Sequence, residues 1–84
     1  MKLEGNMKYQ KILTIVSLIN TALVLCDIHD LSYSASKKDE TLTITVLSES
    51  ELNYPIYKGL LDDVSTQDIL YLLITDIRVF LQWM

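Results

Sequence analysis

The chain has 84 residues, half of them hydrophobic, with a formal net charge of −4 and a single cysteine. A chain of this length forms one domain and buries only roughly 60–65% of the surface that its unfolded form exposes. So much apolar surface exceeds what one small core hides, so we expect a second copy or another protein to cover the remainder. The lone cysteine excludes an internal disulfide framework and fits a reducing cytoplasm.

The distribution of charge argues against direct contact with nucleic acid. Residues 1–11 carry three basic groups and one acidic group, whereas the rest of the chain carries four basic and ten acidic groups. Binding to phosphate backbones normally needs several Lys or Arg side chains on one face, and the only later basic pair is Lys37-Lys38. We therefore expect a protein partner and no nucleic-acid partner.

The first element is an apolar run, residues 12–26, that allows three interpretations. An export signal would need small residues before its cleavage site, but large aliphatic residues precede Cys26. A membrane span needs about 20 apolar residues, and this run is shorter and interrupted by polar residues. Polar residues recur at steps of three and four on one side and apolar residues on the other, which predicts an amphipathic helix over residues 7–28.

The middle of the chain changes from a helical period to strict alternation. Two runs in which Leu, Tyr, Ala, Ile and Val alternate with Ser and Thr flank the polar segment 37–40, which predicts a β-hairpin over residues 31–47. A third alternating run, residues 51–57, contains Pro55, which cannot donate a hydrogen bond to a neighbouring strand. This run is expected to be an edge strand or an extended loop.

The last element is predicted to be a helix over residues 65–83. Ser65 and Asp68 have the spacing of a capping box, and no Gly or Pro follows them. The apolar arc of this helix is wide enough for two partners, so we expect part of it to face another chain. Asp76 lies inside the arc, where it is expected at the rim or opposite a basic group of a partner. The predicted interface residues are Leu70, Leu73, Asp76, Ile77, Phe80, Leu81 and Trp83.

No motif in the sequence predicts catalysis or a cofactor. Cys26 and His29 could offer two metal ligands, but the chain has no second Cys or His to complete a zinc site. Cys26 falls in the apolar stripe of the first helix, where a thiol is a small, inert core residue. Gly5 and Gly59 cannot build a phosphate-binding loop. We expect no catalytic residues, no metal and no small-molecule substrate.

Together these patterns predict a small α+β domain with helices packed on one face of an antiparallel sheet. The leading functional hypothesis is a cytoplasmic, non-catalytic interaction module that forms a homodimer through its apolar helices. One alternative is an acidic inhibitor that docks on a basic surface of a larger, nucleic-acid-binding protein. The other is an exported or membrane-associated protein that uses residues 12–26 as a targeting segment.

Overall fold

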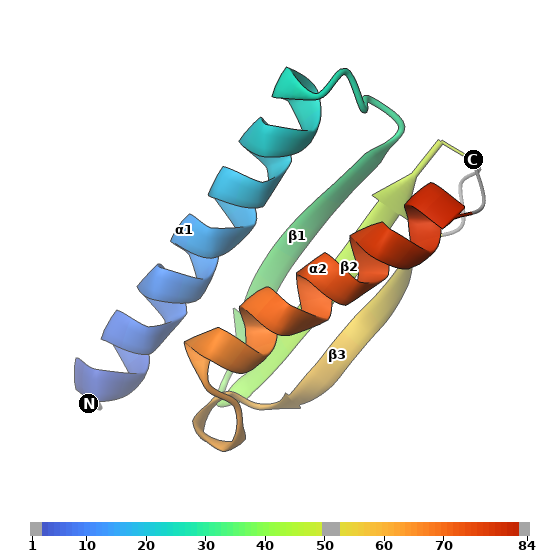
Figure 1. Ribbon diagram of the computed structural model, residues 1–84. Coiled ribbons are helices and arrows are strands. Elements are labelled where there is room, and N and C mark those ends of the chain that lie inside the picture. Colours follow the sequence, from blue (N-terminus) through green and yellow to red (C-terminus); the bar gives the residue numbers. More distant parts are fainter. Residues whose placement is uncertain (1–2, 50–52, 83–84) are drawn as a thin grey trace.

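The protein is built from two layers, a three-stranded sheet and a pair of helices that lie on the same face of it (Figure 1). The computed structural model describes residues 3–49 and 53–82, with side chains from Met7 onward. The helices are α1 (Leu3–Leu25) and α2 (Thr66–Gln82), and the short 3-10 helix η1 (Leu61–Asp63) precedes α2. The strands are β1 (Leu31–Lys38), β2 (Thr41–Ser48) and β3 (Tyr54–Leu60), in the antiparallel order β1-β2-β3. The predicted α+β architecture is confirmed.

The hairpin forms at the predicted place with a tighter turn than expected. Lys38 pairs with Thr41, so only Asp39 and Glu40 connect the two strands. Asp39 has φ 55°, a left-handed conformation that Asp tolerates better than most residues and that a two-residue hairpin loop requires. Lys37 and Lys38 therefore belong to β1 rather than to the connection.

The third strand is shifted along the chain from its predicted position. It starts at Tyr54 and ends at Leu60, whereas the prediction was 51–57, and residues 51–52 lie outside the described part. Pro55 sits in an edge strand, as expected for a residue without an N–H. The register between β2 and β3 shifts between Ile44 and Thr45, which marks a β-bulge next to the proline.

The first helix ends three residues earlier than predicted, because Asp27 turns the chain. Asp27 has φ 64°, and the N–H groups of Asp27 and Ile28 donate to the carbonyls of Val24 and Leu23 at 3.0 and 2.8 Å. This pair of hydrogen bonds is the Schellman arrangement that terminates many helices. Cys26 consequently lies at the exposed end of the helix and not in the core, which corrects the prediction that it is buried.

The second helix begins with the predicted capping box. The N–H of Asp68 donates to Oγ of Ser65 at 3.0 Å, and the N–H of Ser65 donates to Oδ2 of Asp68 at 3.3 Å. Two N–H groups that would otherwise lack partners are satisfied in this way.

The core lies between the sheet and the two helices. It combines side chains from every element except β3, and Ile56 and Tyr57 of β3 pack against its margin. The buried residues are Ile12, Val16, Leu23, Leu31, Tyr33, Leu42, Ile44, Val46, Leu61, Val64, Ile69 and Leu73.

Candidate interaction surface

One position on the free edge of β1, Tyr33, is capped by a side chain of α1. Asn20 accepts a hydrogen bond from the N–H of Tyr33 through Oδ1 and donates one to its carbonyl through Nδ2, both at 2.9 Å. The carboxamide therefore offers β1 the same donor and acceptor pair that a neighbouring strand would offer. An edge strand with these groups open would be a template for another strand.

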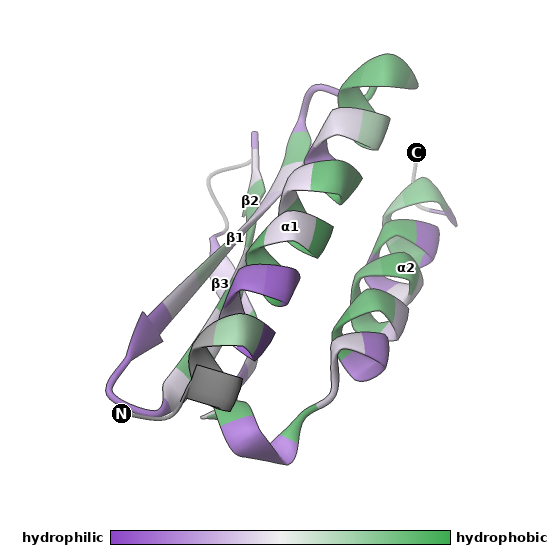
Figure 2. Ribbon diagram, turned by 90° about the vertical axis from the view of Figure 1, so that its left-hand side faces the viewer, coloured by the Kyte–Doolittle hydropathy of each residue, from purple (hydrophilic) through white to green (hydrophobic). Residues whose placement is uncertain are grey.

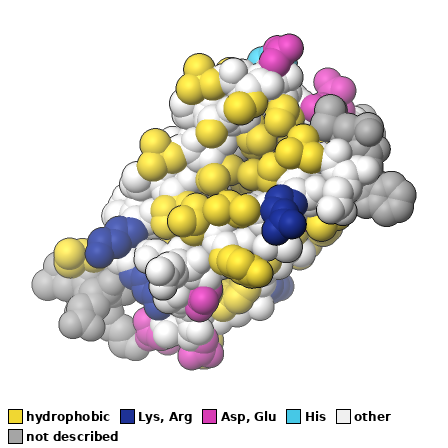
Figure 3. All heavy atoms as spheres, viewed as in Figure 1, with side chains coloured by type: hydrophobic (Ala, Val, Ile, Leu, Met, Phe, Trp, Pro, Cys, Tyr) yellow, Lys and Arg dark blue, Asp and Glu magenta, His cyan; other side chains and the backbone are white. Residues whose placement is uncertain are grey.

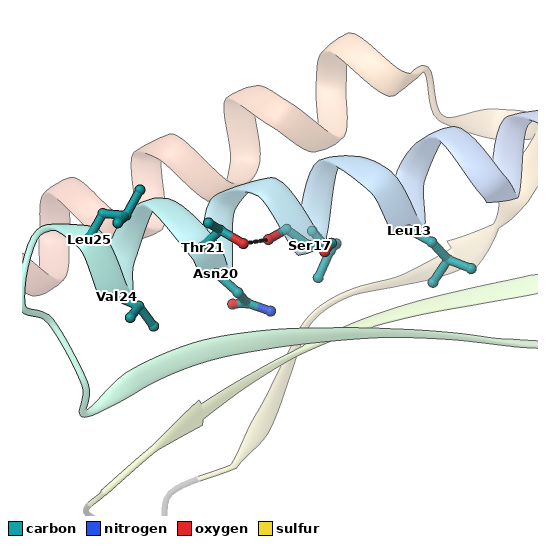
Figure 4. A pocket seen from close by; sticks show the side chains of 7 residues that line it. Leu13, Ser17, Asn20, Thr21, Val24 and Leu25 are labelled. Carbon is teal, nitrogen blue, oxygen red and sulfur yellow. Dashed lines mark hydrogen bonds between the residues drawn. The ribbon is translucent and has the colours of Figure 1, made fainter.

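The neutral polar side of α1 is explained by this contact. Beside Asn20, a groove of about 450 Å³ runs along the helix and is lined by Leu13, Val16, Ser17, Asn20, Thr21, Val24 and Leu25 (Figure 4). The hydroxyl of Thr21 donates to the carbonyl of Ser17 at 3.0 Å, and that of Thr14 donates to the carbonyl of Gln10. Since the hydroxyls bond their own helix and the amide bonds β1, this side needs no charged residues.

The opposite edge, β3, is also poorly suited to strand addition. Pro55 cannot donate, the bulge between Ile44 and Thr45 distorts the adjoining register, and the exposed Lys58 places a charge on the strand. Each of these features discourages pairing of an edge with a further strand. Both edges of the sheet are thus protected by different means.

The outer face of the sheet carries mainly hydroxyl groups. Ser34 pairs with Thr45 and Ser36 pairs with Thr43, and all four side chains point away from the helices. The two serines are exposed and the two threonines are half-buried. Small hydroxyls suit a solvated sheet face, so this surface offers little apolar area to a partner.

The outer face of the helical layer is very different. Leu18 and Leu25 of α1 are 63% and 82% exposed, and Ile74 of α2 is 44% exposed. The opposite side of α2 is turned toward β3, where Leu72 and Thr75 line a pocket with Tyr57. Hydrophobic side chains gather over both helices, and a basic side chain lies among them (Figure 3). We call the following set the helix-layer patch: Leu18, Ala22, Leu25, Leu70, Ile74 and Leu81.

The colouring by hydropathy agrees with this description. Seen from the side, most of α2 and the C-terminal half of α1 are hydrophobic, whereas the N-terminal half of α1 includes hydrophilic turns (Figure 2). Aliphatic residues therefore remain on the surface of helices that already bury a full apolar stripe against the sheet.

The total accessible surface of the chain is larger than expected for its mass. The accessible surface is 5958 Å², whereas a compact monomer of 9.7 kDa is expected to expose about 5,100 Å². The radius of gyration is 13.0 Å, compared with about 12 Å for a compact domain of this length. The molecule is elongated, and its extra surface includes the exposed helix-layer patch.

The residues predicted to form an interface separate into three groups. Leu73 is fully buried in the protein's own core, so no area of it remains for a second chain, and Ile77 and Phe80 pack against that core. Leu70 and Leu81 are exposed on the patch, and Trp83 lies outside the described residues. The predicted set did not include Leu18, Leu25 and Ile74, which are exposed on the same layer.

Asp76 finds its partner within the chain. The hydroxyl of Tyr33 in β1 donates to Oδ2 of Asp76 in α2 at 2.5 Å, joining residues 43 positions apart. Burial raises the pKa of the Tyr33 phenol, and the hydrogen bond to Asp76 raises it further. The phenol therefore stays protonated and remains a donor, and this contact ties α2 to the sheet.

Replacement of Tyr33 by Phe is expected to lower the free energy of unfolding by about 1–3 kcal/mol, because the half-buried carboxylate of Asp76 loses its donor. Urea unfolding followed by circular dichroism measures the change. Tyr71→Phe, which removes a hydroxyl from a side chain 74% exposed, is the matched control and should change stability little. Equal stability of Tyr33→Phe and the wild-type protein would show that the contact adds nothing.

Cys26 and His29 do not assemble a metal site. Nε2 of His29 lies 2.8 Å from Oδ1 of Asp27, and both side chains are largely exposed. Within residues 3–49 and 53–82, no group of three or more His, Cys, Asp or Glu side chains is placed to hold a metal ion.

Comparisons with family models, curated proteins and solved structures find no match for this chain. Among the described residues, neither helix combines the length and the hydropathy needed to cross a bilayer.

Proposed function

We propose that the protein is a non-catalytic interaction module that works as a homodimer, with the helix-layer patch as its interface. The observation that carries this proposal is the set of aliphatic side chains left exposed on both helices, Leu25 above all at 82%. Contiguous apolar surface of this kind marks an interaction site in soluble proteins. The lone, exposed Cys26 suits a cytoplasmic location, where thiols stay reduced.

The amount of surface supports a second copy as the partner. The surface exceeds that expected for a compact monomer by roughly 850 Å², close to the area of about 800 Å² that each partner buries in a stable interface of standard size.

The other surfaces support the same choice. Asn20 caps the β1 edge at Tyr33, the β3 edge carries Pro55 and a bulge, and hydroxyls predominate on the outer sheet face beside Leu47 and Leu60. On the helical layer, exposed apolar residues of α1 and α2 gather on one face.

The decisive experiment is sedimentation equilibrium over a hundredfold range of concentration. We expect the mass of a dimer for the wild-type protein and the mass of a monomer for Ile74→Lys, because a lysine at the centre of the patch would have to be desolvated on association. Ser34→Lys adds the same charge to the outer sheet face and should remain dimeric.

Circular dichroism of Ile74→Lys must match that of the wild-type protein, so that loss of the dimer is not loss of the fold. A wild-type protein that stays a folded monomer at the highest concentration would overturn the proposal.

The geometry gives less support to docking on a basic surface. Acidic side chains lie at both ends of the molecule, around Asp27 and Asp30 at one end and around Asp63 and Asp68 at the other. Lys8 and Lys11 lie near the second group. An inhibitor that mimics a polyanion would be expected to gather its carboxylates on one face.

A further inference from the structure

The charges of α1 run against the dipole of the helix. Lys8 and Lys11 lie in its N-terminal half, where the dipole is positive, and Asp27 and Asp30 follow its C-terminus, where the dipole is negative. The aspartates are unfavourable at the C-terminal end of an isolated helix, whereas Lys8 and Lys11 lie beyond the first turn, where the dipole has little effect. At the N-terminus of α2 the charge and the helix dipole are complementary, because the acidic Asp68 lies in the first turn.

The two helices run in the same direction, so their dipoles add. Lys8 and Lys11 line a pocket together with Ser65 and Thr66, which places the N-terminal ends of α1 and α2 side by side (Figure 1). The other end of the layer holds the C-terminus of α1, followed by Asp27 and Asp30. α1 is therefore basic in its N-terminal half and is followed by acidic residues, and Asp63 and Asp68 lie beside its basic half.

We infer that the second copy packs on the helix-layer patch in an antiparallel orientation, about a two-fold axis that crosses the helices. This inference rests on the proposed homodimer and specifies its geometry. The axis places α1 over α1 and α2 over α2 of the partner. Lys11 of one protomer then lies against Asp27 of the other, and the N-terminus of α2 lies over the C-terminus of the partner's α2, where opposed dipoles attract.

The spacing of residues along α1 fits such an axis. Lys11 and Asp27 lie 16 positions apart, or about 24 Å at helical rise, and Leu18 is close to their midpoint. Since Lys8 and Lys11 of α1 lie beside the start of α2, Ile74 of α2 lies at about the same height as Leu18. The axis therefore passes close to Leu18 and Ile74, and the C-terminal half of α1 lies over the N-terminal half of the partner's α1.

The second helix fits the same axis. With Ile74 at the centre, Arg78 of one protomer comes over the region of Tyr71 of the other. Tyr71 is 74% exposed, so its ring is open to a guanidinium group. A cation over an aromatic ring is a favourable contact at an interface.

An orientation with the axis along the helices makes a different set of contacts. It places α1 over α2 of the partner with their N-termini together, which aligns all four dipoles and brings Asp27 toward Arg78. The two orientations therefore pair Asp27 with different residues, Lys11 in one and Arg78 in the other, and charge exchange distinguishes them.

The test uses the full chain and three single variants, Lys11→Glu, Asp27→Lys and Arg78→Asp. Lys11→Glu and Asp27→Lys should each weaken self-association by about tenfold or more, because each sets like charges against each other in the dimer. An equimolar mixture of these two variants should form a heterodimer of near wild-type affinity, measured by native mass spectrometry. Asp39→Lys, at the β1–β2 turn outside the patch, is the control and should change nothing.

The outcomes separate this inference from the proposed function. If the wild-type protein is dimeric and the mixture of Asp27→Lys with Arg78→Asp restores association instead, the orientation is parallel and the inference is overturned. A dimer whose affinity none of the three variants changes also overturns it. A monomeric wild-type protein overturns the proposed function itself.

Discussion

Replacement of Leu73 by Ala is expected to lower the free energy of unfolding by about 2–5 kcal/mol. Leu73 is fully buried between α2 and the sheet, together with Ile69, Leu42 and Ile44. Truncation leaves a cavity that a close-packed core fills only in part, and an 84-residue domain has a total stability of about 5–15 kcal/mol at most. Urea unfolding at a fixed protein concentration measures this loss.

The next residue along the helix provides the matched control. Ile74→Ala removes side-chain atoms of similar number from a position that faces away from the sheet. At concentrations far below the dimer dissociation constant, it should change the free energy of unfolding by less than about 1 kcal/mol. Because association adds to apparent stability, both variants must be compared at several concentrations. If Leu73→Ala and Ile74→Ala lowered the free energy of unfolding equally, Leu73 could not be assigned to the core and Ile74 to the exposed patch.

Replacement of Asn20 by Ala is expected to cost about 1–3 kcal/mol and to promote aggregation. The variant leaves the N–H and the carbonyl of Tyr33 without the two hydrogen bonds of 2.9 Å that the carboxamide supplies. It also opens the β1 edge to strands of other molecules. Urea unfolding measures the first effect, and light scattering during prolonged incubation measures the second.

Two further variants separate the hydrogen bonds of Asn20 from its packing. Asn20→Asp keeps an acceptor for the N–H of Tyr33 but sets a carboxylate against the carbonyl, so it should be at least as destabilising as Asn20→Ala. Thr21→Ala removes an exposed hydroxyl that bonds only its own helix and should be nearly neutral. Stability of Asn20→Ala equal to that of Thr21→Ala would show that Asn20 does not protect the edge.

The elements of the fold were predictable because each has a local cause. Alternation of Leu42, Ile44 and Val46 with threonines specifies a strand with one buried face, and the capping box of Ser65 and Asp68 marks the start of α2. The end of α1 was misplaced because Asp27 adopts a left-handed conformation that glycine usually supplies.

The surface was less predictable because it depends on contacts between distant residues. Asn20 meets β1 and Asp76 meets Tyr33 only after the chain has folded, and helical spacing alone does not show which apolar side chains the sheet will cover. A wide apolar arc predicted a second partner for α2, but the division into Leu73 inside and Ile74 outside required the position of the helix on the sheet.

The closure of the β1 edge by α1 has a consequence for the order of events during synthesis. Residues of α1 leave the ribosome before those of β1, so the helix that carries Asn20 is already available when the edge strand emerges. The hairpin thus never has to wait for a later segment to shield its first strand from neighbouring nascent chains. The inner face of β2, with Leu42 and Ile44, is different. It is also covered by α2, and that helix is translated last.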